Sequence, residues 1–137
     1  MPGYLFRSRD GMTNFKAGPQ LFTSNMRHSG LLIREGRLYV FFTNRGDEPE
    51  RIMLSTIELT DDWSEWTASE PIEVLRPEMD YEGADLPLEA SKGGYIDERV
   101  HQLRDPAIYQ EGDKTYLLYS VAGESGIAIA EINFHKP

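Results

Sequence analysis

Carboxylates are concentrated in one stretch of this 137-residue sequence, between residues 76 and 103. Four of them fall between residues 80 and 89, with Tyr81 among them. Two neighbouring carboxylates can share acid–base work if the surroundings keep one of them protonated. Glu89 is the first choice for that proton donor, because it follows the apolar Leu86-Pro87-Leu88 and we expect partial desolvation there. Glu82 is the second choice, and the alternative is a solvated acidic loop without catalytic work.

Two polar doublets are the other residues that could contact a ligand. Arg104 and Asp105 stand at the head of an apolar segment, and Arg27 and His28 hold the equivalent position in an earlier segment. A carboxylate beside an arginine can hold a ligand hydroxyl or shift the pKa of a neighbour. The alternatives are structural: Asp105 can cap the turn before Pro106, and His28 can be an ordinary hydrogen-bonding residue.

The elements that must position these residues are short strands. Arg34-Glu35-Gly36 predicts a hairpin turn, and Glu111-Gly112-Asp113 predicts a second one of the same kind. The segment 37–43 is apolar at consecutive positions, so this strand should be covered on both faces. Strands are predicted at residues 3–8, 19–22, 31–33, 37–43, 52–59, 72–75, 107–110, 115–121 and 127–132.

These strands predict an all-β chain built from antiparallel sheets. Residues 28–75 form a four-stranded meander within about 50 residues, the size of a propeller blade. Residues 3–23 form a half-blade, residues 76–103 an acidic loop, and residues 104–132 a last blade of three strands. We therefore interpret residues 1–137 as a single partial β-propeller domain of about two and a half blades.

Composition limits the classes of partner. The net charge of −9 argues against sequence-independent binding of nucleic acid and against an anionic membrane surface. The absence of cysteine excludes disulfides and zinc–thiolate sites. No cofactor or metal is predicted, because a calcium ion in a central channel would need further oxygen ligands that the sequence does not place. Residues 1–6 are too short and too uncharged for a signal peptide, so the compartment stays unknown.

The chain resembles the five-bladed β-propeller glycoside hydrolases of the family 43 type and their relatives. The likeness is carried by Arg-Asp-Pro-Ala-Ile-Tyr at 104–109 and by Glu-Gly-Asp-Lys-Thr-Tyr-Leu-Leu-Tyr-Ser at 111–120. Ser-Arg-Asp-Gly at 8–11 and Asp-Asp-Trp-Ser-Glu-Trp at 61–66 add to it. The match is to the C-terminal half of such a propeller, whose catalytic aspartates lie largely in earlier blades.

The resemblance implies a glycoside hydrolase, or a fragment of one, that acts on a plant- or algal-type polysaccharide or oligosaccharide. Glu89 or Glu82 would then be the proton donor, with Arg27, His28, Arg104 and Asp105 lining the substrate pocket. The alternative is a non-catalytic carbohydrate-binding or scaffold half-propeller, so the resemblance does not establish an enzyme. Trp63 and Trp66 could stack on sugar rings, although support of an outer strand is the preferred interpretation. Open blade edges predict a homodimer that covers them.

Overall fold

The fold is all-β, as predicted, and consists of three antiparallel sheets. The computed structural model describes residues 3–134. Its strands are β1 (Tyr4–Arg7), β2 (Lys16–Gln20), β3 (Met26–Arg34), β4 (Arg37–Asn44), β5 (Ile52–Glu58), β6 (Ile72–Leu75), β7 (Arg104–Glu111), β8 (Lys114–Val121) and β9 (Gly126–Glu131). Two short 3-10 helices, η1 (Trp63–Glu65) and η2 (Asp80–Glu82), interrupt the connections. Within the described residues, no helix has the length and apolar character needed to cross a membrane.

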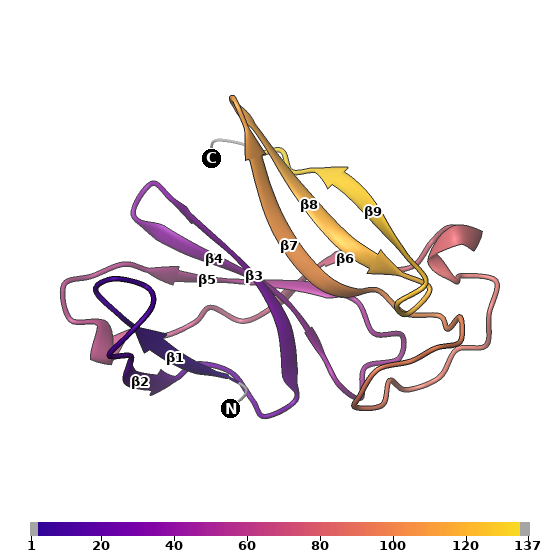
Figure 1. Ribbon diagram of the computed structural model, residues 1–137, viewed down its shortest axis with the longest axis horizontal. Helices are drawn as coiled ribbons and strands as arrows, with labels where there is room; N and C mark the ends of the chain where they lie inside the picture. Colours follow the sequence, from indigo (N-terminus) through magenta and orange to yellow (C-terminus); the bar gives the residue numbers. More distant parts are fainter. Residues whose placement is uncertain (1–2, 135–137) are drawn as a thin grey trace.

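The sheets follow one another along the chain. The first pairs β1 with β2, the second has the order β3-β4-β5-β6, and the third has the order β7-β8-β9. Figure 1 shows the third sheet crossing the second at a steep angle, with the β1–β2 hairpin at the opposite end. The four-stranded meander predicted for the middle of the chain is therefore present, and the third sheet has three strands in the described region.

Both predicted hairpin turns are two-residue turns with glycine where the backbone needs it. Arg34 pairs with Arg37 across Glu35 and Gly36, which have φ of 50° and 73°. These two positive values are typical of a type I′ turn, whose twist matches that of the flanking strands. In the third sheet Glu111 pairs with Lys114, and Gly112 has φ of 61°. The turns fix the register of β3 on β4 and of β7 on β8.

Strand β4 is buried on both faces, as its consecutive apolar residues predicted. Phe41 packs toward the third sheet, in a cluster with Leu117 and Tyr119 of β8. Leu38 and Phe42 belong to the cluster on the opposite face, which the hairpin and η1 region cover. Strand β4 therefore contributes to both apolar clusters and packs against the layers on its two sides.

The first strands of the second and third sheets, β3 and β7, lie against each other. Gly30 of β3 makes this approach possible, because a Cβ atom there would lie 2.9 Å from the carbonyl oxygen of Pro106 and 3.3 Å from Cα of Ala107. Any side chain at Gly30 would have to push the backbone of β7 away. The polar doublets at the heads of both strands are therefore brought into one place.

Residues 76–103 form an ordered strap rather than a free loop. Its backbone bonds to the connections within both large sheets: Ser91 N–H donates at 3.0 Å to the carbonyl of Asp47, between β4 and β5, and Ala122 N–H, between β8 and β9, donates to Glu82 O at 3.1 Å. Figure 1 shows the strap running around the end of the molecule from the second sheet to the third. The strap holds the two sheets together at the end where the doublets lie.

Some predicted strand limits were wrong. The strand expected at 19–22 is β2 at Lys16–Gln20, because Gly18 and Pro19 are accommodated on a short edge strand rather than ending it. Gly18 lies against the ring of Trp63, where a Cβ atom would be 2.3 Å from Cζ3. Strands β3 and β7 also begin earlier than predicted and include the doublets themselves.

We predict that Gly30→Ala lowers the free energy of unfolding by about 1–3 kcal/mol, the usual cost of overpacking. The contact with the Pro106 backbone leaves the new methyl group no space. Gly126→Ala is the matched control, since a Cβ there meets only the Val121 side chain at 3.4 Å. That variant should stay within about 1 kcal/mol of the wild type. Urea unfolding followed by tryptophan fluorescence measures both; equal stabilities of the two variants would contradict the close approach of β3 and β7.

Candidate functional site

His28 and Asp105 face each other at the heads of β3 and β7. Each is the extra residue of a β-bulge, with a register shift between Arg27 and Ser29 and another between Arg104 and Ala107. Both have a left-handed backbone, with φ of 47° at His28 and 49° at Asp105. Histidine and aspartate are among the few residue types that accept this conformation. The bulges direct the two side chains together, with Nδ1 of His28 3.0 Å from Oδ1 of Asp105.

A cleft of about 510 Å³ opens beside this pair. Asp105 is further fixed by Ser120 of β8, whose hydroxyl donates to Oδ2 at 3.0 Å. The side chains of His28 and Asp105 are 31% and 43% exposed, so a ligand in the cleft can reach them. The cleft is lined by Ser24, Asn25, Met26, Arg27, His28, Arg45, Gly93, Gly94, Tyr95, Asp105 and Glu124. Three of the four predicted binding residues are thus in one cleft.

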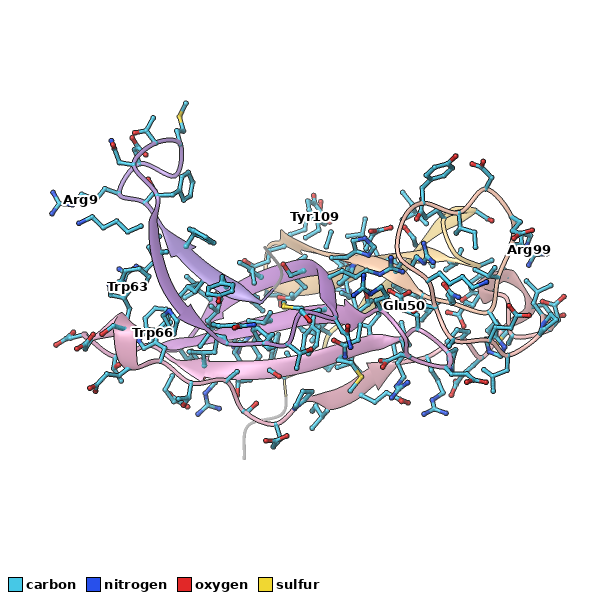
Figure 2. All side chains as sticks on the ribbon, turned by 90° about the horizontal axis from the view of Figure 1, so that it is seen from below. Arg9, Glu50, Trp63, Trp66, Arg99 and Tyr109 are labelled. Carbon is cyan, nitrogen blue, oxygen red and sulfur yellow. The ribbon has the colours of Figure 1, made fainter. Side chains whose placement is uncertain are left out.

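A buried ionic network lies beneath the cleft. Glu50, which is fully buried, receives a two-point contact from Arg27, with Nε donating to Oε1 at 2.8 Å and Nη2 to Oε2. Nε of Arg104 lies 3.5 Å from the same carboxylate. Figure 2 shows Glu50 in the interior, where the second and third sheets meet. One carboxylate therefore holds the arginines of both doublets.

Arg104, the fourth predicted binding residue, supports the cleft from below and is only 1% exposed. Its Nη2 donates to Oε1 of Gln102 at 2.7 Å, and its Nη1 donates to Oε1 of Glu124 at 2.8 Å. Nη1 also lies 3.3 Å from the carbonyl oxygen of Gly94, in the strap. Arg104 does not line the cleft, so the predicted contact with a ligand stays a prediction. Arg104 instead positions Glu124 and the Gly94 segment, both of which line the cleft.

The two predicted proton donors lie away from this cleft. Glu82 is 3% exposed, accepts from the Tyr119 hydroxyl at 3.0 Å and accepts from the backbone N–H of Glu78 at 2.8 Å. Burial, helped by the Glu82 carboxylate, raises the pKa of the Tyr119 phenol well above its usual range, so this hydroxyl remains a donor. These bonds make Glu82 a cap of η2 that ties the strap to β8.

Glu89 is exposed, so the expected desolvation by Leu86-Pro87-Leu88 was wrong. Leu88 is itself 52% exposed and covers nothing. Glu89 lines a smaller hollow of about 200 Å³, together with His101 and Arg99. Of the three apolar residues on which the expectation relied, Pro87 and Leu88 are exposed and Leu86 is half-buried.

The two tryptophans support the β1–β2 hairpin. The guanidinium of Arg7 lies 5.1 Å from the ring of Trp63 and 5.5 Å from the ring of Trp66. Trp66 donates from Nε1 to the Thr60 carbonyl at 3.1 Å. Figure 2 places both rings at the base of the projecting loop that carries Arg9, far from Glu50.

Sequence reasoning missed four residues of the site. Glu50 was interpreted as part of a polar loop, and no periodic pattern in the sequence distinguishes it from its neighbours there. Glu124 lies in the turn between β8 and β9, while Arg45 follows the end of β4. Tyr95 comes after Gly93-Gly94, and that glycine pair was the one available signal that the backbone turns sharply there. In the described part of the chain, no group of three or more acidic or histidine side chains could hold a metal ion.

The comparisons with known proteins give one relative of unassigned function. The chain is 43% identical over 146 aligned residues to the uncharacterized protein R118 of Acanthamoeba polyphaga mimivirus. The alignment covers 95% of this chain and 41% of the viral protein, so the chain spans less than half of that relative. No family model matches the chain, and no solved structure matches it.

We predict that Glu50→Ala lowers the free energy of unfolding by about 3–5 kcal/mol, because it leaves Arg27 and Arg104 without their shared buried partner. Glu58→Ala removes a carboxylate that also pairs with an arginine, Arg37, but is 64% exposed. This control should leave stability nearly unchanged. Equilibrium unfolding in urea compares the two, and a Glu50 variant as stable as the Glu58 variant would contradict the role of the network.

Proposed function

We propose that this chain binds a saccharide in the cleft between the heads of β3 and β7. The observation that carries the proposal is the His28–Asp105 pair, held at 3.0 Å by two bulges and open to the cleft. Sugar hydroxyls both donate and accept, so they need fixed partners of both kinds, which an imidazole and a carboxylate provide. Tyr95, 80% exposed at the rim, offers an aromatic ring for the apolar face of a sugar.

A role within a glycoside hydrolase is the second candidate. Asp105 and Glu124 are two carboxylates on one cleft, the pair that glycoside hydrolysis requires. Their contacts favour binding over proton donation, because each carboxylate already accepts a hydrogen bond at close range: Asp105 from the Ser120 hydroxyl at 3.0 Å, and Glu124 from Nη1 of Arg104 at 2.8 Å. A general acid in such enzymes is usually kept protonated by apolar surroundings. We therefore assign saccharide binding to this chain and leave hydrolysis to be tested with the same ligands.

The test of saccharide binding uses substitutions that keep the bulges intact. Asp105→Asn and His28→Asn place a residue that tolerates positive φ, so the backbone is preserved. Each should weaken binding of oligosaccharides containing arabinose, xylose or galactose by roughly tenfold or more, the value of one charge-assisted hydrogen bond. Isothermal titration calorimetry gives the dissociation constants.

Glu111→Gln is the control, because this exposed carboxylate lies at the opposite end of β7. Its affinity should equal that of the wild type. The proposal would be overturned if none of these oligosaccharides bound and no acidic oligosaccharide bound either. Turnover of the corresponding aryl glycosides that Asp105→Asn abolishes would extend it to hydrolysis, and turnover that needs Glu89 or Glu82 instead would restore the first assignment of the proton donor.

We further propose that the three sheets are blades of a five-bladed propeller and that a second copy completes it. The second sheet has four strands, while the third has three in the described region, so β9 presents an open edge. On β9 itself, Ile127 and Ile129 are 77% and 59% exposed. Tyr109 on β7, at the other edge of the same sheet, is 50% exposed, and Figure 2 shows it standing clear of the ribbon. An apolar face and an unpaired edge are features that association covers.

Light scattering at micromolar concentration should therefore give the mass of a dimer. Ile127→Lys should shift the protein to the monomer, because a charge is placed on the covered face. Leu88→Lys is the control, since Leu88 is 52% exposed but lies on the strap, away from β9. A wild-type protein of monomeric mass would contradict the dimer.

A further inference from the structure

One cation at the cleft, Arg45, has no counter-ion among residues 3–134. Arg27 pairs with Glu50, Arg104 pairs with Glu124, and His28 lies against Asp105. Arg45 also lines the cleft, yet no ion pair joins it to a carboxylate of residues 3–134. The other charged side chains of the cleft are thus satisfied within the protein, while Arg45 is available to a ligand.

Arg45 is held in place at the rim. Its backbone N–H donates to the carbonyl of Asn25 at 2.8 Å, and its Nη2 lies 3.4 Å from the Asn25 amide oxygen. The side chain runs along the backbone of Gly93, where a Cβ atom would stand 3.3 Å from Cδ and 3.5 Å from Nη1 of Arg45. Asn25 and Gly93 both line the cleft, so the guanidinium is presented at its edge with its orientation restricted.

The net negative charge of the chain makes an arginine without a carboxylate partner unusual. Asp and Glu outnumber Lys and Arg by 23 to 14, so carboxylates are abundant around any arginine of this protein. The overall field of an acidic protein repels anions, and a fixed guanidinium at a cleft is the local feature that reverses it. A guanidinium also offers parallel N–H donors that match the two oxygens of a carboxylate or the oxygens of a sulfate.

We infer that the saccharide bound in this cleft is anionic, carrying a uronate carboxylate or a sulfate ester that Arg45 binds. The inference rests on the proposed function and names its substrate class. His28 and Asp105 bind hydroxyl groups of the sugar at the floor of the cleft, and Arg45 binds the acidic group at the rim. A neutral saccharide leaves the guanidinium without a partner and gains only the hydroxyl contacts.

The experiment compares three ligands of similar size: a galacturonate oligosaccharide, a sulfated galacto-oligosaccharide and the neutral galacto-oligosaccharide. Calorimetric titration of the wild-type protein should give at least tenfold tighter binding of one anionic ligand than of the neutral one. The preferred ligand of the two tells whether the acidic group is a carboxylate or a sulfate. The advantage should shrink at high salt, because the guanidinium is at the exposed rim.

Arg45→Gln should reduce the affinity for the preferred anionic ligand about tenfold or more and leave the neutral ligand unchanged. Arg45→Lys should retain part of the preference, since it keeps the charge without the planar fork. Arg9→Gln is the matched control: Arg9 is likewise exposed and in no ion pair of the described residues, but it lies in the loop that projects from the far end of the molecule (Figure 2).

The outcomes separate the two proposals. Equal binding of neutral and anionic ligands, or an Arg45→Gln protein that keeps the preference, overturns the inference while saccharide binding stands. Binding of none of the three ligands, together with none of the neutral arabinose and xylose series, overturns saccharide binding and the inference with it. An equal loss in Arg9→Gln would show a general charge effect and would also overturn the role of Arg45.

Discussion

The contact on which the site depends is the buried carboxylate of Glu50 between two arginines. A carboxylate removed from water is costly unless it is fully paired, and here Arg27 and Arg104 both reach it. The two arginines belong to different sheets, so the pairing also fixes how the second and third sheets meet. The pairing of Glu50 also determines the shape of the cleft above it, because Arg104 holds Glu124 and the carbonyl of Gly94 as well.

Much of the fold could be predicted from the sequence because its signals are local. The consecutive apolar residues of β4 indicated burial on both faces, and glycine marked both hairpin turns. The predicted limits of β2 were wrong because the packing of Trp63 on Gly18 decides where that strand lies. A local sequence pattern does not reveal a contact of this kind. The starts of β3 and β7 were predicted too late for a related reason: bulges let the pairing continue through the polar doublets that precede the apolar residues.

The candidate site was predicted in part, and there is a physical reason why some of its residues were found and others were missed. The doublets Arg27-His28 and Arg104-Asp105 were found because they precede recognisable strands, and three of these residues line the cleft. Burial was misjudged in both directions. Glu89 was expected to be desolvated and is exposed, whereas Glu50 looked like a loop residue and is fully buried. Burial of a charge depends on partners distant in the sequence, here 23 residues for Arg27 and Glu50.

The two bulges have a consequence for how similar the second and third sheets can be. His28 and Asp105 occupy the same place in equivalent strands, with nearly the same φ, and their side chains meet at 3.0 Å. Two aspartates at that separation would repel each other, so a carboxylate at one position favours a different residue type at the other. Near-symmetry of the backbone is thus combined with asymmetry of the side chains. Where two strands of similar backbone touch at equivalent points, a carboxylate in one of them is therefore best accommodated when the other carries a different residue type.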